Sequence, residues 1–180
     1  MPDPISDYAI AADGFAAVLA GCAGQDLSGP SPCSEWDAQG VIDHVIGGMG
    51  YFAPAFGGTA ADVEGETDLV AKFDKARSAL DSAIRTDGIL EQMVPGPMGD
   101  MPGAALLGIA TTDVLVHTWD LAQATGQDVE LDARLLQQGW DNLKPVEAMV
   151  RGNNVFGPAV DVADDAPMQD KALAFFGRTP

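Results

Sequence analysis

The chain has 180 residues but only two histidines, His44 and His117, so any chemistry that needs an imidazole must use one or both. Asp113 stands four positions before His117. On an α-helix, side chains four positions apart share a face, with Cβ atoms about 5–6 Å apart, which suits two ligands of one metal ion. With His44 as a third ligand, one coordination position would stay open for water or a substrate.

The same residues also fit a buried polar network without a metal. The helical stripe that carries Asp113 and His117 is otherwise apolar, with Ile109 and Val116 beside them. An unpartnered carboxylate or imidazole on such a stripe costs several kcal/mol, so these groups need a metal ion or hydrogen bonds. Spacing alone leaves both interpretations open. Asp120 is either an acceptor that orients His117 or an exposed residue near the end of the helix.

Helical periodicity dominates the segments that must position these residues. It predicts helices over 7–22, from an N-cap at Ser34 or Asp37 to about residue 54, over 69–83, and over 104–124 with Gly126 just beyond the end. In the second helix, His44 lies beside Val41 and Val45 and points to the interior, and glycines at 47 and 48 leave space beside it. A fifth pattern over 132–150 should be kinked or split by Pro145.

The remaining segments are irregular. Residues 87–103 contain three prolines and predict either a lid-like loop or a poorly ordered one. Residues 151–180 predict an appendage with a short helical turn around 168–176, and strand signals are sparse. We therefore expect an all-α chain with a single domain over 1–180, in which a four-helix bundle spans about 5–150.

Charge and cysteine content restrict the class of protein. Nine Lys and Arg residues against 27 Asp and Glu give a net charge of −18, which disfavours nucleic acid and anionic membrane surfaces as partners. No apolar run approaches the ~20 residues that span a bilayer. Two cysteines, Cys22 and Cys33, are too few for a disulfide framework and predict reduced thiols in a cytoplasmic protein.

Two blocks of sequence resemble a known family. The run Pro32–Asp37 followed by Val41–Gly48, and the run Asp113–Ala122, resemble the signatures of DinB-like metalloenzymes, in the actinobacterial branch that includes mycothiol-dependent maleylpyruvate isomerase. The closing segment from Phe156 is similar to that of short, uncharacterised metal-binding members.

The resemblance implies a four-helix bundle that holds one divalent metal, zinc first and nickel second, through three side chains on two helices. Carried over by position, these ligands are His44, Asp113 and His117. Asp113 takes a place that is His in many members and Glu in the isomerase. Since Asp is one methylene shorter than Glu, direct ligation and ligation through water both stay open.

These expectations favour a metal-dependent enzyme that uses a low-molecular-weight thiol, such as mycothiol, as co-substrate in a transferase or isomerase reaction on a small molecule. The isomerase activity itself is not transferred, because residues 151–180 are too few for that enzyme's further C-terminal domain. The sequence does not assign a catalytic side chain, and the scarcity of basic residues counts against an acidic thiol conjugate.

Three alternatives stay open. The first is a hydrolase that uses metal-bound hydroxide. The second is a non-catalytic metal-binding or interaction module, which would need a fourth protein donor from Cys33, Glu35 or Asp120. The third is a metal-free bundle whose polar stripe forms the seam of a homodimer.

Overall fold

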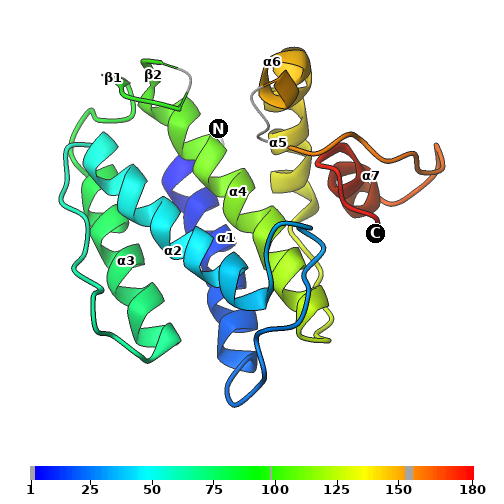
Figure 1. Ribbon diagram of the computed structural model, residues 1–180. Coiled ribbons are helices and arrows are strands. Elements are labelled where there is room, and N and C mark those ends of the chain that lie inside the picture. Colours follow the sequence, from blue (N-terminus) through cyan, green and yellow to red (C-terminus); the bar gives the residue numbers. More distant parts are fainter. Residues whose placement is uncertain (1–2, 98, 153–155) are drawn as a thin grey trace.

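Four long helices pack side by side in the computed structural model, which describes residues 3–97, 99–152 and 156–180 (Figure 1). These helices are α1 (Pro4–Gly21), α2 (Ala38–Ala55), α3 (Leu69–Ile84) and α4 (Gly103–Ala124). The most extensive contact is between α1 and α4, and α2 packs on both α3 and α4. The expected all-α four-helix bundle is confirmed.

Aspartate side chains start most of these helices. The carboxylates of Asp3, Asp37 and Asp68 accept hydrogen bonds from the first free backbone N–H groups of α1, α2 and α3. Such caps stabilise a helix by about 1 kcal/mol each. Of the two N-caps that the sequence offered for α2, Asp37 and not Ser34 is used. Part of the large acidic excess therefore serves local structure.

Helix α4 has no side-chain cap, and backbone carbonyl groups replace it. The N–H groups of Gly103 and Ala104 donate to the carbonyls of Gln92 and Leu90, both at 2.8 Å. A Cβ atom at Gly103 would lie 2.4 Å from the carbonyl oxygen of Ile89, so only glycine permits this approach. The segment before α4 thus anchors the start of this helix.

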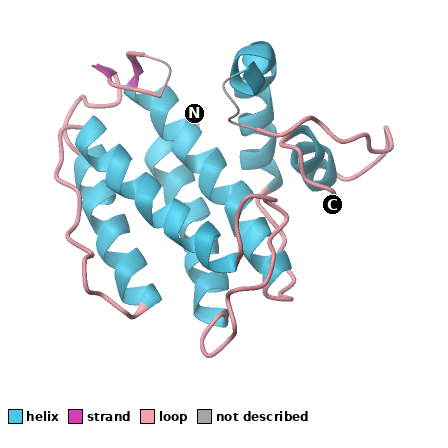
Figure 2. Cartoon of the chain, in the orientation of Figure 1, coloured by secondary structure: helices cyan, strands magenta, loops and turns pink. Residues whose placement is uncertain are grey.

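That segment also forms an antiparallel pair of short strands, β1 (Met93–Val94) and β2 (Met101–Pro102), which the sequence did not predict (Figure 2). Residue 98, in the predicted loop 87–103, lies outside the described residues. The pairing is only two residues long, too short for the alternation by which a strand is detected in sequence.

The C-terminal part packs against the bundle through α5 (Ala133–Leu143). A Cβ atom at Gly139 would lie 2.7 Å from Oγ1 of Thr112, so this glycine allows α5 to approach α4 closely. As predicted, the pattern breaks at Pro145, where a 3₁₀ turn (Lys144–Val146) separates α5 from α6 (Glu147–Gly152). Helix α7 (Met168–Phe175) confirms the predicted C-terminal helical turn and packs on α5.

The helix interiors supply the core, where the rings of Phe15 on α1 and Phe73 on α3 stack at 5.2 Å between centroids. Within the described part of the chain, no helix combines the length and apolar character that crossing a bilayer requires.

Candidate metal centre

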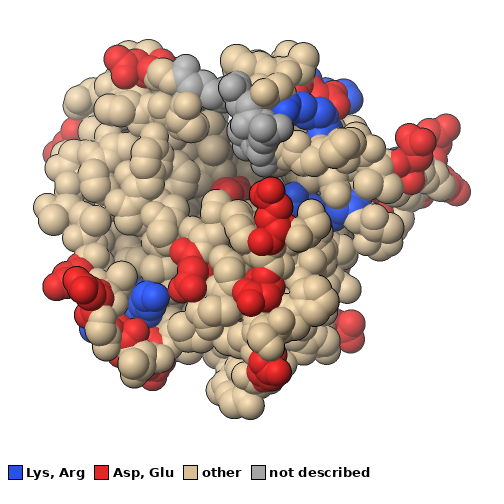
Figure 3. Space-filling view, viewed as in Figure 1, with Lys and Arg blue, Asp and Glu red and all other residues tan. Residues whose placement is uncertain are grey.

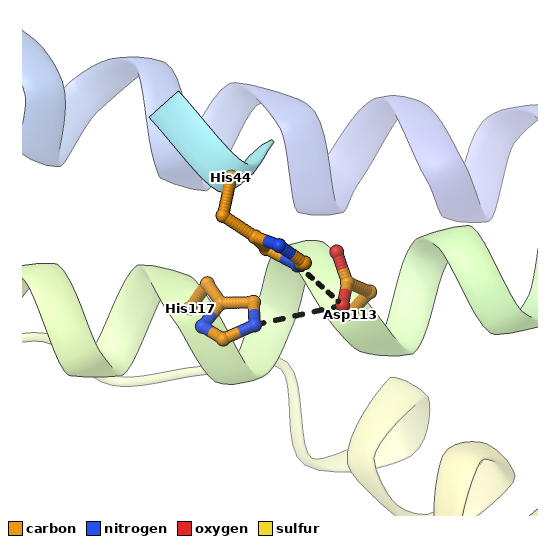
Figure 4. A group of neighbouring side chains, drawn as sticks. All are labelled: His44, Asp113 and His117. Atoms are coloured by element: carbon orange, nitrogen blue, oxygen red, sulfur yellow. Dashed lines mark hydrogen bonds and ion pairs between the residues drawn. The ribbon is translucent and has the colours of Figure 1, made fainter. Parts of the chain in front are cut away.

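Helices α2 and α4 bring the three candidate ligands together. Figure 4 shows His44 reaching from α2 toward Asp113 and His117, which lie one turn apart on α4. Oδ1 of Asp113 lies 3.2 Å from Nε2 of His44 and 3.5 Å from Nε2 of His117. All three ligand atoms fall within 4.8 Å of one another.

This spacing fits a metal ion. Ligand atoms that lie 2.0–2.2 Å from a tetrahedral zinc ion are about 3.3–3.6 Å apart, close to both observed Asp113–histidine distances. Two imidazoles and one carboxylate are also a donor set that zinc and nickel accept. The three residues therefore fit the divalent metal ion that the family resemblance implied, and Asp113 lies at a distance from both histidines that suits direct ligation.

Behind His117, a chain of charged groups runs into the protein interior. Nδ1–H of His117 donates to Oδ2 of Asp120 at 2.9 Å. Both oxygens of Asp120 in turn accept from the Arg178 guanidinium, at 3.1 and 2.6 Å. Asp120 is fully buried, so the expectation that it is exposed is wrong. Its role in orienting a metal ligand stays a prediction, which its bond to His117 supports. This arrangement places a proton on Nδ1 and turns Nε2 toward Asp113.

The surroundings of Asp113 and His117 favour the charged form of each side chain. Burial works against ionisation of Asp113, but its bonds to His117 and His44 prevail and hold its pKa well below the usual range. Burial likewise opposes protonation of His117, yet Asp113 and Asp120 outweigh it and raise the pKa of His117 to about 9. Without a metal, a proton on His117 therefore takes the place that a cation would fill.

His44 is held differently. The Trp36 indole stacks on the His44 ring, with 4.3 Å between centroids and 29° between planes. The His44 side chain is 34% exposed, against 8% for His117. Among the described residues, none forms a hydrogen bond with Nδ1 of His44. An aromatic face thus supports the α2 ligand where hydrogen bonds support the α4 ligand.

A pocket of about 980 Å³ opens beside the three residues. Figure 3 shows the surface hollowed between the bundle and the C-terminal part, where Lys and Arg side chains gather at one edge. The bundle side of the pocket includes Trp36, Ile109 and Val116, and the C-terminal side includes Arg151 and Arg178. The pocket therefore combines apolar side chains with charged ones of both signs, since Glu35 and Asp113 also line it.

The other residues that the sequence singled out have clear positions. Cys33 and Glu35 line the pocket but do not join the group of three, and burial raises the pKa of the Cys33 thiol. Asp120 lies behind His117, bonded to Arg178. Among the described residues, none of the three proposed fourth donors thus converges on the ligand atoms.

The two arginines of the pocket were not predicted from the sequence. Basic residues counted as scarce, yet Arg151 and Arg178 both line the pocket. Arg151 donates to Glu147 and to the carbonyl oxygens of Gly157 and Phe175, so it also braces the C-terminal segment. The available signal was the closing segment's resemblance to metal-binding members, since Arg178 lies within it.

Known proteins similar to this chain identify its family. Two curated relatives from Mycobacterium tuberculosis, the uncharacterized proteins Rv0738 (strain H37Rv) and MT0763 (strain CDC 1551), are each 37% identical to the chain, with 98% of both sequences covered. No solved structure matches. The family model described as the mycothiol maleylpyruvate isomerase N-terminal domain matches residues 8–122, a range that includes all three candidate ligands. The chain belongs to this mycothiol-related, DinB-like family.

Proposed function

We propose that this protein is a divalent-metal-dependent enzyme, with zinc as the first candidate metal, that uses a low-molecular-weight thiol such as mycothiol as co-substrate. The observation that carries the proposal is the convergence of His44, Asp113 and His117 at ligand-to-ligand distances, at the wall of a pocket large enough for a small molecule. Family membership supports the thiol as co-substrate.

The chain's own residues would divide the work. His44, Asp113 and His117 bind the ion, and a divalent ion with these ligands keeps a net charge of +1, enough to lower the pKa of a thiol in its open position. Asp120 and Arg178 fix the tautomer of His117.

An open position favours an enzyme over a structural metal module. A structural site needs four protein ligands, and only three side chains of the described residues converge here. All three residues line the pocket, so a small molecule bound in it would lie beside them. Arg151 and Arg178 line the pocket but are already paired with Glu147 and Asp120, so the scarcity of free cations still counts against an acidic conjugate.

Cobalt substitution tests the proposal with a spectroscopic signal. The Co²⁺-loaded protein is titrated with N-acetylcysteine, with N-acetylserine as the matched ligand that has a hydroxyl in place of the thiol, and then with mycothiol. We expect a sulfur-to-cobalt charge-transfer band in the near ultraviolet with both thiols and none with N-acetylserine.

Two variants locate the signal. His44→Ala should abolish the band, whereas Asp43→Ala should retain it, because Asp43 is the exposed neighbour whose side chain pairs with Lys72. A protein that binds cobalt but gives the same spectrum with and without thiol would contradict the thiol proposal. A band that persists in His44→Ala would contradict the assigned site.

A further inference from the structure

Trp36 lies over both histidines of the candidate centre. Its ring centroid is 4.3 Å from that of His44 and 5.4 Å from that of His117. The two imidazoles meet edge to face at 4.6 Å, so the three rings form one cluster. Trp36 also lines the pocket. The indole is therefore a shared boundary of the ligands and the cavity.

The backbone around Trp36 is fixed by several hydrogen bonds. Its carbonyl oxygen accepts from both the N–H and the hydroxyl of Ser31, at 3.2 and 2.8 Å. Its own N–H donates to the carbonyl of Cys33 at 2.9 Å. This tight turn holds the indole before the first turn of α2, four residues along the chain from Gly40, which itself precedes His44 by one helical turn.

Gly40 gives the indole the room that it needs. A Cβ atom at this position would lie 2.9 Å from Cβ of Trp36 and 3.3 Å from Cγ of its ring. Glycine in a helix costs about 1 kcal/mol relative to alanine, so a packing reason is expected for it. Here the reason is that Trp36 folds back onto the helix and reaches His44.

The two histidines differ in what orients them. Nδ1 of His117, the ring nitrogen that faces away from Asp113, is hydrogen-bonded to Asp120. His44 has no such partner among the residues that the structure describes, although metal-bound histidines usually donate their second N–H to a neighbouring group. We infer that Trp36 is the positioning residue of His44, an inference that rests on the proposed metal site. The indole holds the His44 ring by stacking, in place of the missing hydrogen bond.

The stack should also respond to the metal. An imidazole bound to a divalent ion carries partial positive charge, and tryptophan has the aromatic face that attracts cations most strongly. Trp36 therefore favours the loaded state of His44 over the free state. It does not touch the reacting atoms in this role and acts through His44.

Zinc affinity and the visible spectrum of the Co²⁺-loaded protein test this inference in two replacements. Trp36→Leu keeps apolar volume but removes the aromatic face. We expect it to weaken zinc binding about tenfold, which is the lower end of the range for losing a group that orients a ligand. We also expect the cobalt ligand-field bands to change. Trp36→Phe keeps an aromatic face and should restore most of the affinity. Trp140→Leu is the matched control, because Trp140 also stacks on another ring, that of Phe175.

Gly40→Ala provides an independent route if Trp36→Leu fails to fold. Alanine favours the helix, but its Cβ displaces the indole, so zinc affinity should fall although every ring is still present. Unchanged zinc affinity and unchanged cobalt bands in the folded Trp36 and Gly40 variants would overturn the inference and leave Trp36 as a pocket wall. A wild-type protein that binds neither metal would overturn the proposed function first, and this inference with it.

Discussion

The two halves of the candidate centre are built by different physical means. The α4 half, His117 with Asp120 and Arg178, is buried and linked by charge-assisted hydrogen bonds. The α2 half, His44 with Trp36, is partly exposed and held by ring stacking. Buried hydrogen-bonded charges fix one geometry, because any other geometry leaves a charge unpaired. A stacked ring can slide and tilt at low cost.

The two halves also depend on different segments. The α4 half needs the C-terminal segment, since Arg178 comes from that segment and Asp120 from α4. The α2 half needs the turn that carries Trp36, which stacks on His44 beside Asp113. Both halves line the pocket, but His117 is buried there whereas His44 is partly exposed.

Breaking the buried half should have the largest effect. Asp120→Ala leaves Arg178 buried without its carboxylate partner, and we expect the free energy of unfolding to fall by about 3–5 kcal/mol. Urea denaturation measures this loss. Asp120→Asn is the conservative comparison and should cost less, because it keeps the shape and part of the hydrogen bonding. Equal stability of Asp120→Ala and wild type would contradict the structural role of this half.

The pH dependence of the metal-free protein's stability should report on His117 in the buried half. Folding raises the pKa of His117 from 6.5 to about 9, so its protonated form contributes stability that is fully present below pH 6.5. That contribution, on the order of 3 kcal/mol, is lost as the pH rises through about 9. Urea denaturation at pH 6 and at pH 9 measures it.

His117→Gln is the control for this pH effect and should remove it. Zinc should suppress the effect as well, because the ion replaces the proton, and zinc affinity should rise with pH over the same range. A metal-free wild type whose stability is the same at both pH values would contradict the pKa shift.

Metal binding should stabilise the folded protein, because the ion would join His44 of the α2 half to Asp113 and His117 on α4. An ion that binds only the folded state stabilises it by about 2.7 kcal/mol at a free concentration 100 times its Kd. Thermal unfolding with zinc and with excess chelator measures the difference. We expect it to vanish in Asp113→Ala, since this carboxylate lies between both histidines. A chelator effect that persists in this variant would assign the metal to another site.

The smallest effect should come from the exposed face of α2, next to the site. Asp43 pairs with Lys72 at 3.4 Å, and its side chain is half exposed. Such surface pairs contribute about 0–1 kcal/mol, so Asp43→Ala should change the unfolding free energy by less than 1 kcal/mol. Zinc content should not change at all. A loss of zinc in this variant would show that the metal site depends on Asp43, although its side chain pairs with Lys72 outside the site.

Periodicity predicted the helices and the helix faces on which the three candidate ligands lie, because both depend on local spacing. That His44 meets Asp113 across 69 positions was suggested by the family resemblance. Asp113 and His117 share a face by helical geometry, and His44 lies on the apolar face of its own helix. The split at Pro145 follows from the missing N–H of proline.

The features that sequence analysis did not predict depend on contacts between distant segments. Arg178 meets Asp120 across 58 positions, and no local pattern specifies that pairing. The stacking of Trp36 depends on a tight turn and on Gly40. The sequence shows this glycine but not that a side chain in its place would collide with the indole. The short pairing of β1 with β2 likewise arises where the segment anchors α4.

The most direct test of the account is the zinc and nickel content of untagged protein purified without chelator, measured by elemental analysis for the wild type, Asp113→Ala and Asp43→Ala. We predict about one equivalent of metal per chain in the wild type and in Asp43→Ala, and none in Asp113→Ala. Wild-type protein that stays free of metal even after incubation with zinc would contradict the central claim, as would Asp113→Ala protein that keeps a full equivalent.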